Sequence, residues 1–264
     1  MLRSVFTKTI WDQRRSLIWW AIGIILLALY TAGLYPYIAT PAFDQYLSQL
    51  PEAVLALLGG SFGLSTIEAY LHSYFFVMMG PLIFAIYAIA AGSGAIAGEE
   101  EKGTLDLLLA NPVPRWRVVV EKFAAMFVGT MILAFFLWFG LALTVAFINV
   151  ELDLWLLAQA CVSSALAGFS FGALALALGG LRGSRGLSIG VTVGATIIAY
   201  LLDSYTSLVK EIEPYKVLSP FYYGSNARPI FNGLDLSHAA VLVAVSLVCA
   251  AIAVVAFERR DVAV

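Results

Sequence analysis

Residues 98–122 hold the densest block of charged side chains in the chain, so they are the residues best suited to bind a partner. The stretch reads GEEEKGTLDLLLANPVPRWRVVVEK. It lies between two apolar runs, each long enough to cross a bilayer, and must therefore protrude into water. Four leucines nevertheless stand at its centre, at Leu105, Leu107, Leu108 and Leu109. Leucines on a short exposed segment need an apolar surface to cover them, and we expect a soluble partner to supply it.

A short helix is predicted over residues 104–110. Thr104 can cap its N-terminus, and Asp106 in the first turn favours the helix dipole. The helix should end by Asn111, because a residue before proline avoids the α region. A two-turn helix is marginal in water, whereas burial of one leucine contributes about 1.5–3 kcal/mol. The other loop on the same side, residues 181–187, is too short to form a groove, which favours docking to a partner.

The elements that position this segment are predicted to be membrane helices. Of 264 residues, 61% are hydrophobic and 12% are charged, about half the charged fraction of a soluble domain. A helix needs about 20 apolar residues to cross a bilayer, and no segment alternates like a barrel strand. Six runs qualify: residues 16–38, 70–98, 123–149, 154–181, 187–209 and 238–257. We predict a single all-α domain over residues 1–264, a polytopic membrane protein with six transmembrane helices.

The basic residues predict the orientation of these spans. With the N-terminus in the cytoplasm, the cytoplasmic side receives Arg3, Lys8, Arg14, Arg15, Lys102, Arg115, Arg117, Lys122, Arg182, Arg185, Arg259 and Arg260. The other side receives Lys210, Lys216 and Arg228. Because basic residues are enriched in cytoplasmic loops, both termini are expected to be cytoplasmic. The net charge of −2 gives no support to a nucleic-acid partner.

Three further segments flank the spans. Residues 2–15 have an amphipathic pattern that predicts an interfacial helix on the inner leaflet, with a solvated tail as the alternative. On the outer side, residues 41–69 predict a short helix resting on the leaflet or on the bundle. Residues 210–237 are rich in proline, glycine and aromatic residues. These two outer segments are expected to form a cap, and a passive aromatic belt is equally compatible with the pattern.

The middles of the spans hold no Asp, Glu, Lys, Arg or His, which argues against a self-contained ion-coupled transporter. Asp203 lies toward the outer end of its span, where a solvated interfacial role is favoured. Cys161 and Cys249 form neither a disulfide framework nor a zinc spacing. No phosphate-binding G-x-x-x-x-G-K-[ST] pattern occurs. We therefore predict no catalytic residues and no metal site, and any ATP must be bound by another chain.

Small residues predict where helices approach each other closely. Two glycine rows stand at four-residue spacing, Gly168 and Gly172 in the fourth span and Gly186, Gly190 and Gly194 in the fifth. Such rows allow backbones to pack together. Packing within one chain is favoured over contact between subunits. In the second span, Gly80-Pro81 should bend the helix, because proline lacks the backbone donor.

Residues 98–113 (GEEEKGTLDLLLANPV) resemble the signature of type-2 ABC transporter permeases, the transmembrane subunits of ABC exporters. In that family a Glu-Lys/Arg-Gly-Thr segment leads a short helix after the second span. The stretches AFERRD (residues 256–261) and LSPFYY (residues 218–223) are similar to the family as well. With the layout of six spans, the resemblance covers essentially the whole chain.

The resemblance implies an exporter of the inner membrane of a prokaryote. Two permease subunits, identical or different, would form the pathway, and two separate ATPase subunits would dock beneath it. ATP and Mg would be bound by the ATPase, with no cofactor on this chain. Residues 104–110 would be the coupling helix, and residues 2–15 the family's interfacial connecting helix. The docking residues would be Glu99, Glu100, Glu101, Gly103, Thr104, Leu105, Asp106, Leu107, Leu108 and Leu109, with Arg182 and Arg185 as a smaller second contact.

Two other functions fit parts of the sequence. An intramembrane protease with a Glu-Glu-x-x-x-Arg motif is disfavoured, because Gly103, Thr104 and Leu105 stand where the arginine is needed and no paired intramembrane histidines exist. A membrane anchor or sensor that recruits a soluble ATPase without transport would use the same docking helix. The sequence leaves that alternative open, as it does the cargo.

Overall fold

The computed structural model describes residues 4–38, 40, 45, 49, 51, 54, 66–105, 113–206, 209 and 211–260. The regular elements of this part are helical. They are α1 (Val5–Ile38), α4 (Ile67–Leu71), the π-helix η1 (His72–Phe76), α5 (Met79–Ala95), α6 (Ala97–Glu101), α8 (Arg115–Phe147), α9 (Leu154–Arg182), α10 (Arg185–Tyr205), the 3-10 helix η2 (Glu213–Leu218), α11 (Pro220–Ser225), α12 (Pro229–Asn232) and α13 (Leu236–Arg259).

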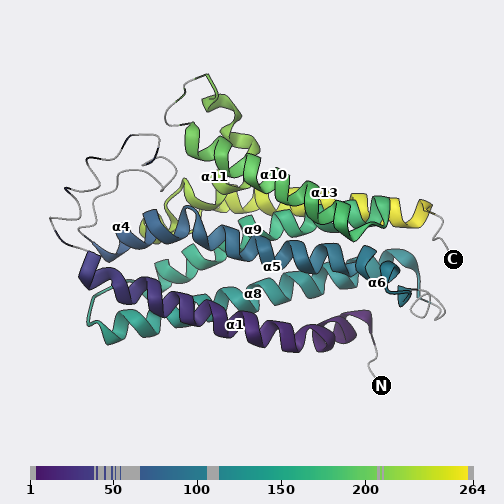
Figure 1. Cartoon of the computed structure of the whole chain (residues 1–264), viewed down its shortest axis with the longest axis horizontal. Helices are drawn as coiled ribbons and strands as arrows, with labels where there is room; N and C mark the ends of the chain where they lie inside the picture. Colours follow the sequence, from purple (N-terminus) through teal and green to yellow (C-terminus); the bar gives the residue numbers. More distant parts are fainter. Residues whose placement is uncertain are drawn as a thin grey trace.

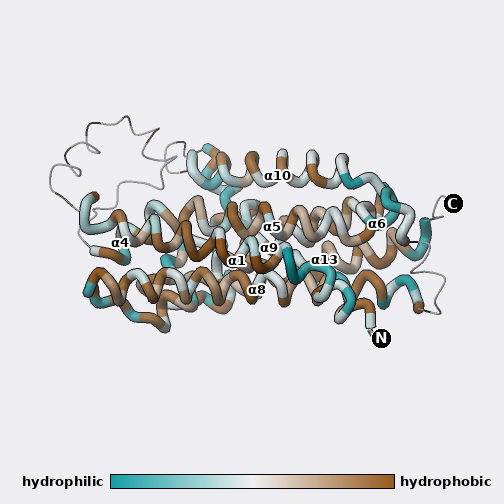
Figure 2. Tube along the Cα trace, turned by 60° about the horizontal axis from the view of Figure 1, so that its bottom comes forward, coloured by the Kyte–Doolittle hydropathy of each residue, from teal (hydrophilic) through white to brown (hydrophobic). Residues whose placement is uncertain are grey.

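In the part of the chain that the structure describes, six helical stretches are long and apolar enough to cross a membrane, with α4, η1 and α5 together forming the second. This confirms the predicted all-α, polytopic membrane protein. The long helices lie side by side in an elongated bundle (Figure 1). Hydrophobic residues dominate along their length and hydrophilic residues gather toward the ends (Figure 2).

The start of α1, the end of α13 and the short helix α6 lie at the same end of the bundle (Figure 1). We call this the junction end; it is the end that the basic residues predict to be cytoplasmic. The helices α4 and α11 lie at the opposite end. An even number of spans places the two ends of the chain on one side, in agreement with this arrangement.

Helix α9 forms the centre of the bundle. The most apolar stretch of this helix is 83% buried, because the helix is rich in Gly, Ala and Ser, which let neighbouring backbones approach. A Cβ atom added at Gly172 would lie 2.5 Å from Ala88 Cβ and 2.8 Å from the Ala88 carbonyl carbon, and one added at Gly168 would clash with Phe84. The first glycine row therefore packs α9 directly against α5.

The second glycine row behaves differently. A Cβ atom added at Gly186, Gly190 or Gly194 would meet no other atom within 4 Å. The row on α10 thus faces open space, which differs from the predicted packing within one chain. Sequence spacing shows that these residues share a helix face, but the direction of that face depends on how α10 sits on α5 and α9.

The second span is interrupted where Gly80-Pro81 predicts a bend. The π-helix ends at Phe76, Val77 and Met78 form a turn, and α5 begins at Met79. Proline at position 81 lacks a backbone donor, and its ring crowds the carbonyl four residues earlier, that of Val77. The helix is therefore broken within one turn before the proline.

The N-terminal segment corrects another prediction. Residues 2–15 are expected to form an interfacial helix separate from the first span, yet α1 runs without a break from Val5 to Ile38. No glycine or proline stands between Val5 and Gly23, so no residue of this stretch favours an end to the helix. The amphipathic residues therefore form the first turns of one long helix.

Within the second outer segment, the described residues 211–237 pack on the bundle as a cap. Phe221 is fully buried, with its ring 5.5 Å from those of Phe171 on α9 and Tyr200 on α10. The Ser219 hydroxyl donates to the Ala199 carbonyl at 2.8 Å, and the Ser163 hydroxyl to the Gly224 carbonyl at 2.8 Å. These contacts favour a cap over a passive belt. The predicted helix within residues 41–69 lies mostly outside the described residues.

Candidate functional site

The charged segment begins with a short helix that breaks away from the second span. Helix α5 ends at Ala95, Ile96 departs from helical geometry (φ −114°, ψ −64°), and α6 follows. Its three glutamates, Glu99, Glu100 and Glu101, each contact a different part of the bundle. We call these residues and their partners the glutamate junction.

Glu99 pairs with Lys122 on α8. The Lys122 ammonium lies 2.6 Å from the Glu99 carboxylate and also donates to the carbonyl of Ala95, the last residue of α5. The Lys122 side chain is 2% exposed and that of Glu99 is 25% exposed. A buried ammonium is costly unless it is paired and hydrogen-bonded, and both conditions are met here. Lys122 therefore fastens α8 to the break between α5 and α6.

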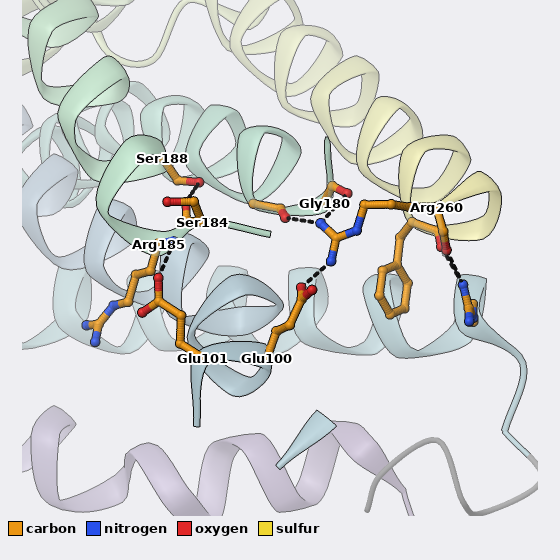
Figure 3. A network of polar contacts seen from close by, with 10 residues as sticks. Glu100, Glu101, Gly180, Ser184, Arg185, Ser188 and Arg260 are labelled. Atoms are coloured by element: carbon orange, nitrogen blue, oxygen red, sulfur yellow. Dashed lines mark hydrogen bonds and ion pairs between the residues drawn. The ribbon is translucent and has the colours of Figure 1, made fainter. Parts of the chain in front are cut away.

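Glu100 pairs with Arg260, the residue that follows α13 (Figure 3). The Arg260 guanidinium also donates to the carbonyls of Gly179 and Gly180 near the end of α9, at 3.4 and 3.3 Å. At the start of α8, Arg115 donates to the carbonyls of Phe257 and Arg260 at 3.2 and 2.7 Å. Cations at helix C-termini satisfy unpaired carbonyls and favour the dipole. The ends of α9 and α13 are thereby tied to α6 and α8.

Glu101 caps the start of α10. Its carboxylate accepts a hydrogen bond from the backbone N–H of Arg185 at 2.8 Å (Figure 3). The Ser184 hydroxyl accepts one from the backbone N–H of Leu187. A carboxylate at a helix N-terminus is favourable, because it meets unpaired N–H groups and the positive end of the dipole. The single helix α6 thus holds α8, α10 and the ends of α9 and α13.

Gly103 and Thr104 turn the chain back after α6. Gly103 adopts φ +65°, a left-handed conformation that favours glycine. The N–H of Gly103 donates to the carbonyl of Glu100 and that of Thr104 to the carbonyl of Glu99, both at 2.9 Å. Leu105 therefore points back into the bundle.

Leu105 is 1% exposed and packs in a core cluster with Val118, Val119 and Phe257. This corrects the prediction that all four leucines of the segment are free to contact a partner. The remaining predicted docking residues, Asp106, Leu107, Leu108 and Leu109, lie outside the described residues.

Comparison with known proteins decides the family. The sequence profile of the ABC-2 family transporter proteins matches residues 3–262. This chain belongs to the ABC-2 family. A curated relative, the "Probable ABC transporter permease protein NosY" of Stutzerimonas stutzeri, is 29% identical over 151 residues. That match covers 56% of this chain and 54% of the relative, so the matched part spans about half of the relative's length.

The residues that this ABC-2 chain exposes at the junction end form a small polar rim. Glu101, Gly103, Thr104 and Arg182 are exposed, whereas Glu99, Glu100 and Arg185 are partly buried. The predicted docking residues therefore divide into two groups. Glu99, Glu100 and Leu105 hold the chain's own bundle together, and the rim faces solvent. Glu101 does both, because it is exposed and also caps α10.

Sequence reasoning missed the partners of the glutamates. The basic pattern predicts only an orienting role for Lys122, Arg260 and Arg115 and does not place them in the site. Their positions give a partial signal, because Arg115 begins α8, Arg260 follows α13, and Lys122 lies about two turns into α8, within reach of the polar groups at the junction end. Among the described residues, no group of three His, Cys, Asp or Glu side chains could hold a metal ion.

Proposed function

We propose that this chain is the permease subunit of an ATP-driven exporter and that a separate ATPase subunit binds and hydrolyses the ATP. The observation that carries this proposal is the glutamate junction. One helix of five residues holds two spanning helices and the ends of two others, and it stands directly before residues 106–112. A partner that pushes on that segment moves α6, and α6 transmits the movement to most of the bundle.

The ATPase contact is proposed for residues 106–110 together with the exposed rim. Leu107, Leu108 and Leu109 would enter a groove on the ATPase, while Leu105 anchors the segment to its own bundle. The family resemblance supports two copies of the ATPase and a second permease subunit. It also supports export across the inner membrane of a prokaryote, with both termini in the cytoplasm.

The docking contact is tested by co-purification of the ATPase with full-length variants. We expect Leu107→Arg to abolish co-purification, because a buried charge without a partner costs several kcal/mol. Leu218→Arg is the matched control, because Leu218 is 72% exposed and belongs to η2 at the opposite end of the bundle. It should retain the ATPase. Equal co-purification of both variants would refute the docking assignment.

The same complex distinguishes transport from mere recruitment. Spin labels can be attached at Tyr215→Cys, which lies outside the spans in η2, and at Leu236→Cys, which begins α13; both positions are exposed. The two native cysteines are buried. ATP should change the distance between these labels when the ATPase is bound. An ATPase that binds and hydrolyses ATP while the label distance stays fixed would favour the anchor function over the permease.

A further inference from the structure

A polar cavity of about 530 Å³ opens at the junction end between α1 and α5. Its wall includes Glu99, Lys122 and Arg185 of the glutamate junction and Thr104 of the exposed rim, but its interior has no role in either. One part of its wall is aromatic or small, with Trp20, Tyr87, Ala90, Ala91 and Gly94. The other part is charged. This division matches an amphiphilic ligand, which has an apolar part and a polar head.

The charged part of the wall has an excess of cations. Lys8, Lys102, Lys122 and Arg185 line it, against the carboxylates of Asp12 and Glu99. Glu99 is paired with Lys122. Three cations then remain, those of Lys8, Lys102 and Arg185. Among the described residues that line the cavity, the one remaining carboxylate is that of Asp12. The cavity therefore has a positive potential and favours an anion.

Two of these cations carry a charge or a donor that no described residue satisfies. The Nε atom of Arg185 is buried and has no hydrogen-bond acceptor among the described residues. The Lys8 side chain is partly buried and forms no ion pair with any residue in the described ranges. The Nε atom itself is enclosed by protein, so an anion in the cavity would pair with the charge of the Arg185 guanidinium and with the Lys8 ammonium, both of which line it.

The aromatic part of the wall is held by side-chain contacts between α1 and α5. The Tyr87 hydroxyl donates to the Gln13 side chain at 3.3 Å, and the rings of Trp20 and Tyr87 meet edge to face at 6.0 Å. These contacts fix α1 against α5 deeper in the bundle, while the two helices leave the cavity open nearer the end. The shape is thus held by the fold.

We propose that this cavity binds a phosphate-bearing anion through Lys8 and Arg185. Arginine and lysine at the cytoplasmic ends of membrane helices commonly bind lipid headgroups, and the apolar wall beside Trp20 suits the glycerol and upper acyl region of a lipid. The same chemistry could come from an anionic phospholipid or from a soluble phosphate ester. The bound anion would link α1 to α10 beside the glutamate junction. The inference does not depend on the proposed ATPase partner.

The proposal is tested on the full-length protein in a neutral detergent. Phosphatidylglycerol, phosphatidylcholine and glycerol 3-phosphate are added separately, and binding is measured by native mass spectrometry and by the shift in melting temperature. We expect phosphatidylglycerol to bind and raise the melting temperature, with little effect from phosphatidylcholine. An equal response to glycerol 3-phosphate would identify a soluble ligand as the source.

The variants assign the binding to the cavity. Lys8→Gln should weaken phosphatidylglycerol binding about fivefold, as expected for the loss of one interfacial cation, and Lys8→Gln with Arg185→Gln should weaken it further. The control Arg15→Gln removes the same charge from an exposed position of α1 outside the cavity and should retain binding. If the double variant does not fold, Lys8→Gln alone decides the test. Binding unchanged in Lys8→Gln, or equal binding of phosphatidylcholine, would overturn the proposal.

Discussion

At the scale of single residues, Lys122 shows how a charge is kept within an apolar bundle. Its ammonium has a carboxylate and a backbone carbonyl within reach, and the carbonyl is free because α5 breaks at Ile96. The break in the helix and the buried cation therefore stabilise each other. Removal of either would leave a buried polar group without its partner.

Leu105 provides a residue-scale prediction. Leu105→Ala should lower the free energy of unfolding of the isolated subunit by about 3 kcal/mol, because it leaves a cavity in a packed core. Leu218→Ala is the control, since Leu218 is 72% exposed, and it should have little effect. Denaturant unfolding in detergent measures both. If the isolated Leu105→Ala subunit were as stable as the wild type, Leu105 would serve only to dock a partner, and this would contradict its observed burial.

At the scale of elements, the two glycine rows lie on similar helices and have opposite environments. The row on α9 brings this helix into contact with α5, and the row on α10 faces open space. The first row therefore sets the distance between two helices of the same chain. The second leaves a strip of exposed backbone on α10 that a neighbouring molecule can approach closely.

The rows give a matched pair of variants. Gly172→Ala should destabilise the subunit by about 1–3 kcal/mol, because the new methyl group overlaps the backbone of α5. Gly190→Ala has space and should be neutral or stabilising by up to about 1 kcal/mol, as alanine has the higher helix propensity. Thermal unfolding of the isolated subunit compares them. Equal melting temperatures would mean that α5 and α9 are not in the close contact described.

At the scale of the whole molecule, polar ties concentrate at the junction end, while the opposite end is closed by the packed segment of residues 211–235. Residues from α6, α8, α9, α10 and α13 share one network at the junction end (Figure 3). A movement applied at this end is therefore distributed among several spans. The cap contacts α9 and α10 at the opposite end of the bundle.

The orientation of the bundle is predicted from its basic residues. In intact cells, a membrane-impermeant maleimide should label Tyr215→Cys and should not label Arg182→Cys until the cells are opened. Both positions are exposed and lie at opposite ends of the bundle, and Cys161 and Cys249 are buried and should give little background. The reverse pattern would place the junction end outside the cell and would exclude an ATPase contact there.

The sequence by itself determined the six spans and the position of the charged segment. It also determined that the two ends of the chain lie on the same side of the bundle. Hydrophobic length and the distribution of basic residues are local properties that add along the chain, so they can be read without a structure. The sequence also located the interruption at Pro81, because the missing donor belongs to one residue.

The tertiary structure decided which of these residues meet. Glu100 and Arg260 are 160 positions apart, and Glu101 and Arg185 are 84 apart, so their pairing depends on which helices become neighbours. The burial of Leu105 and the outward direction of the glycine row on α10 have the same origin. A helical pattern defines a face, but the packing of side chains from several helices decides what that face contacts.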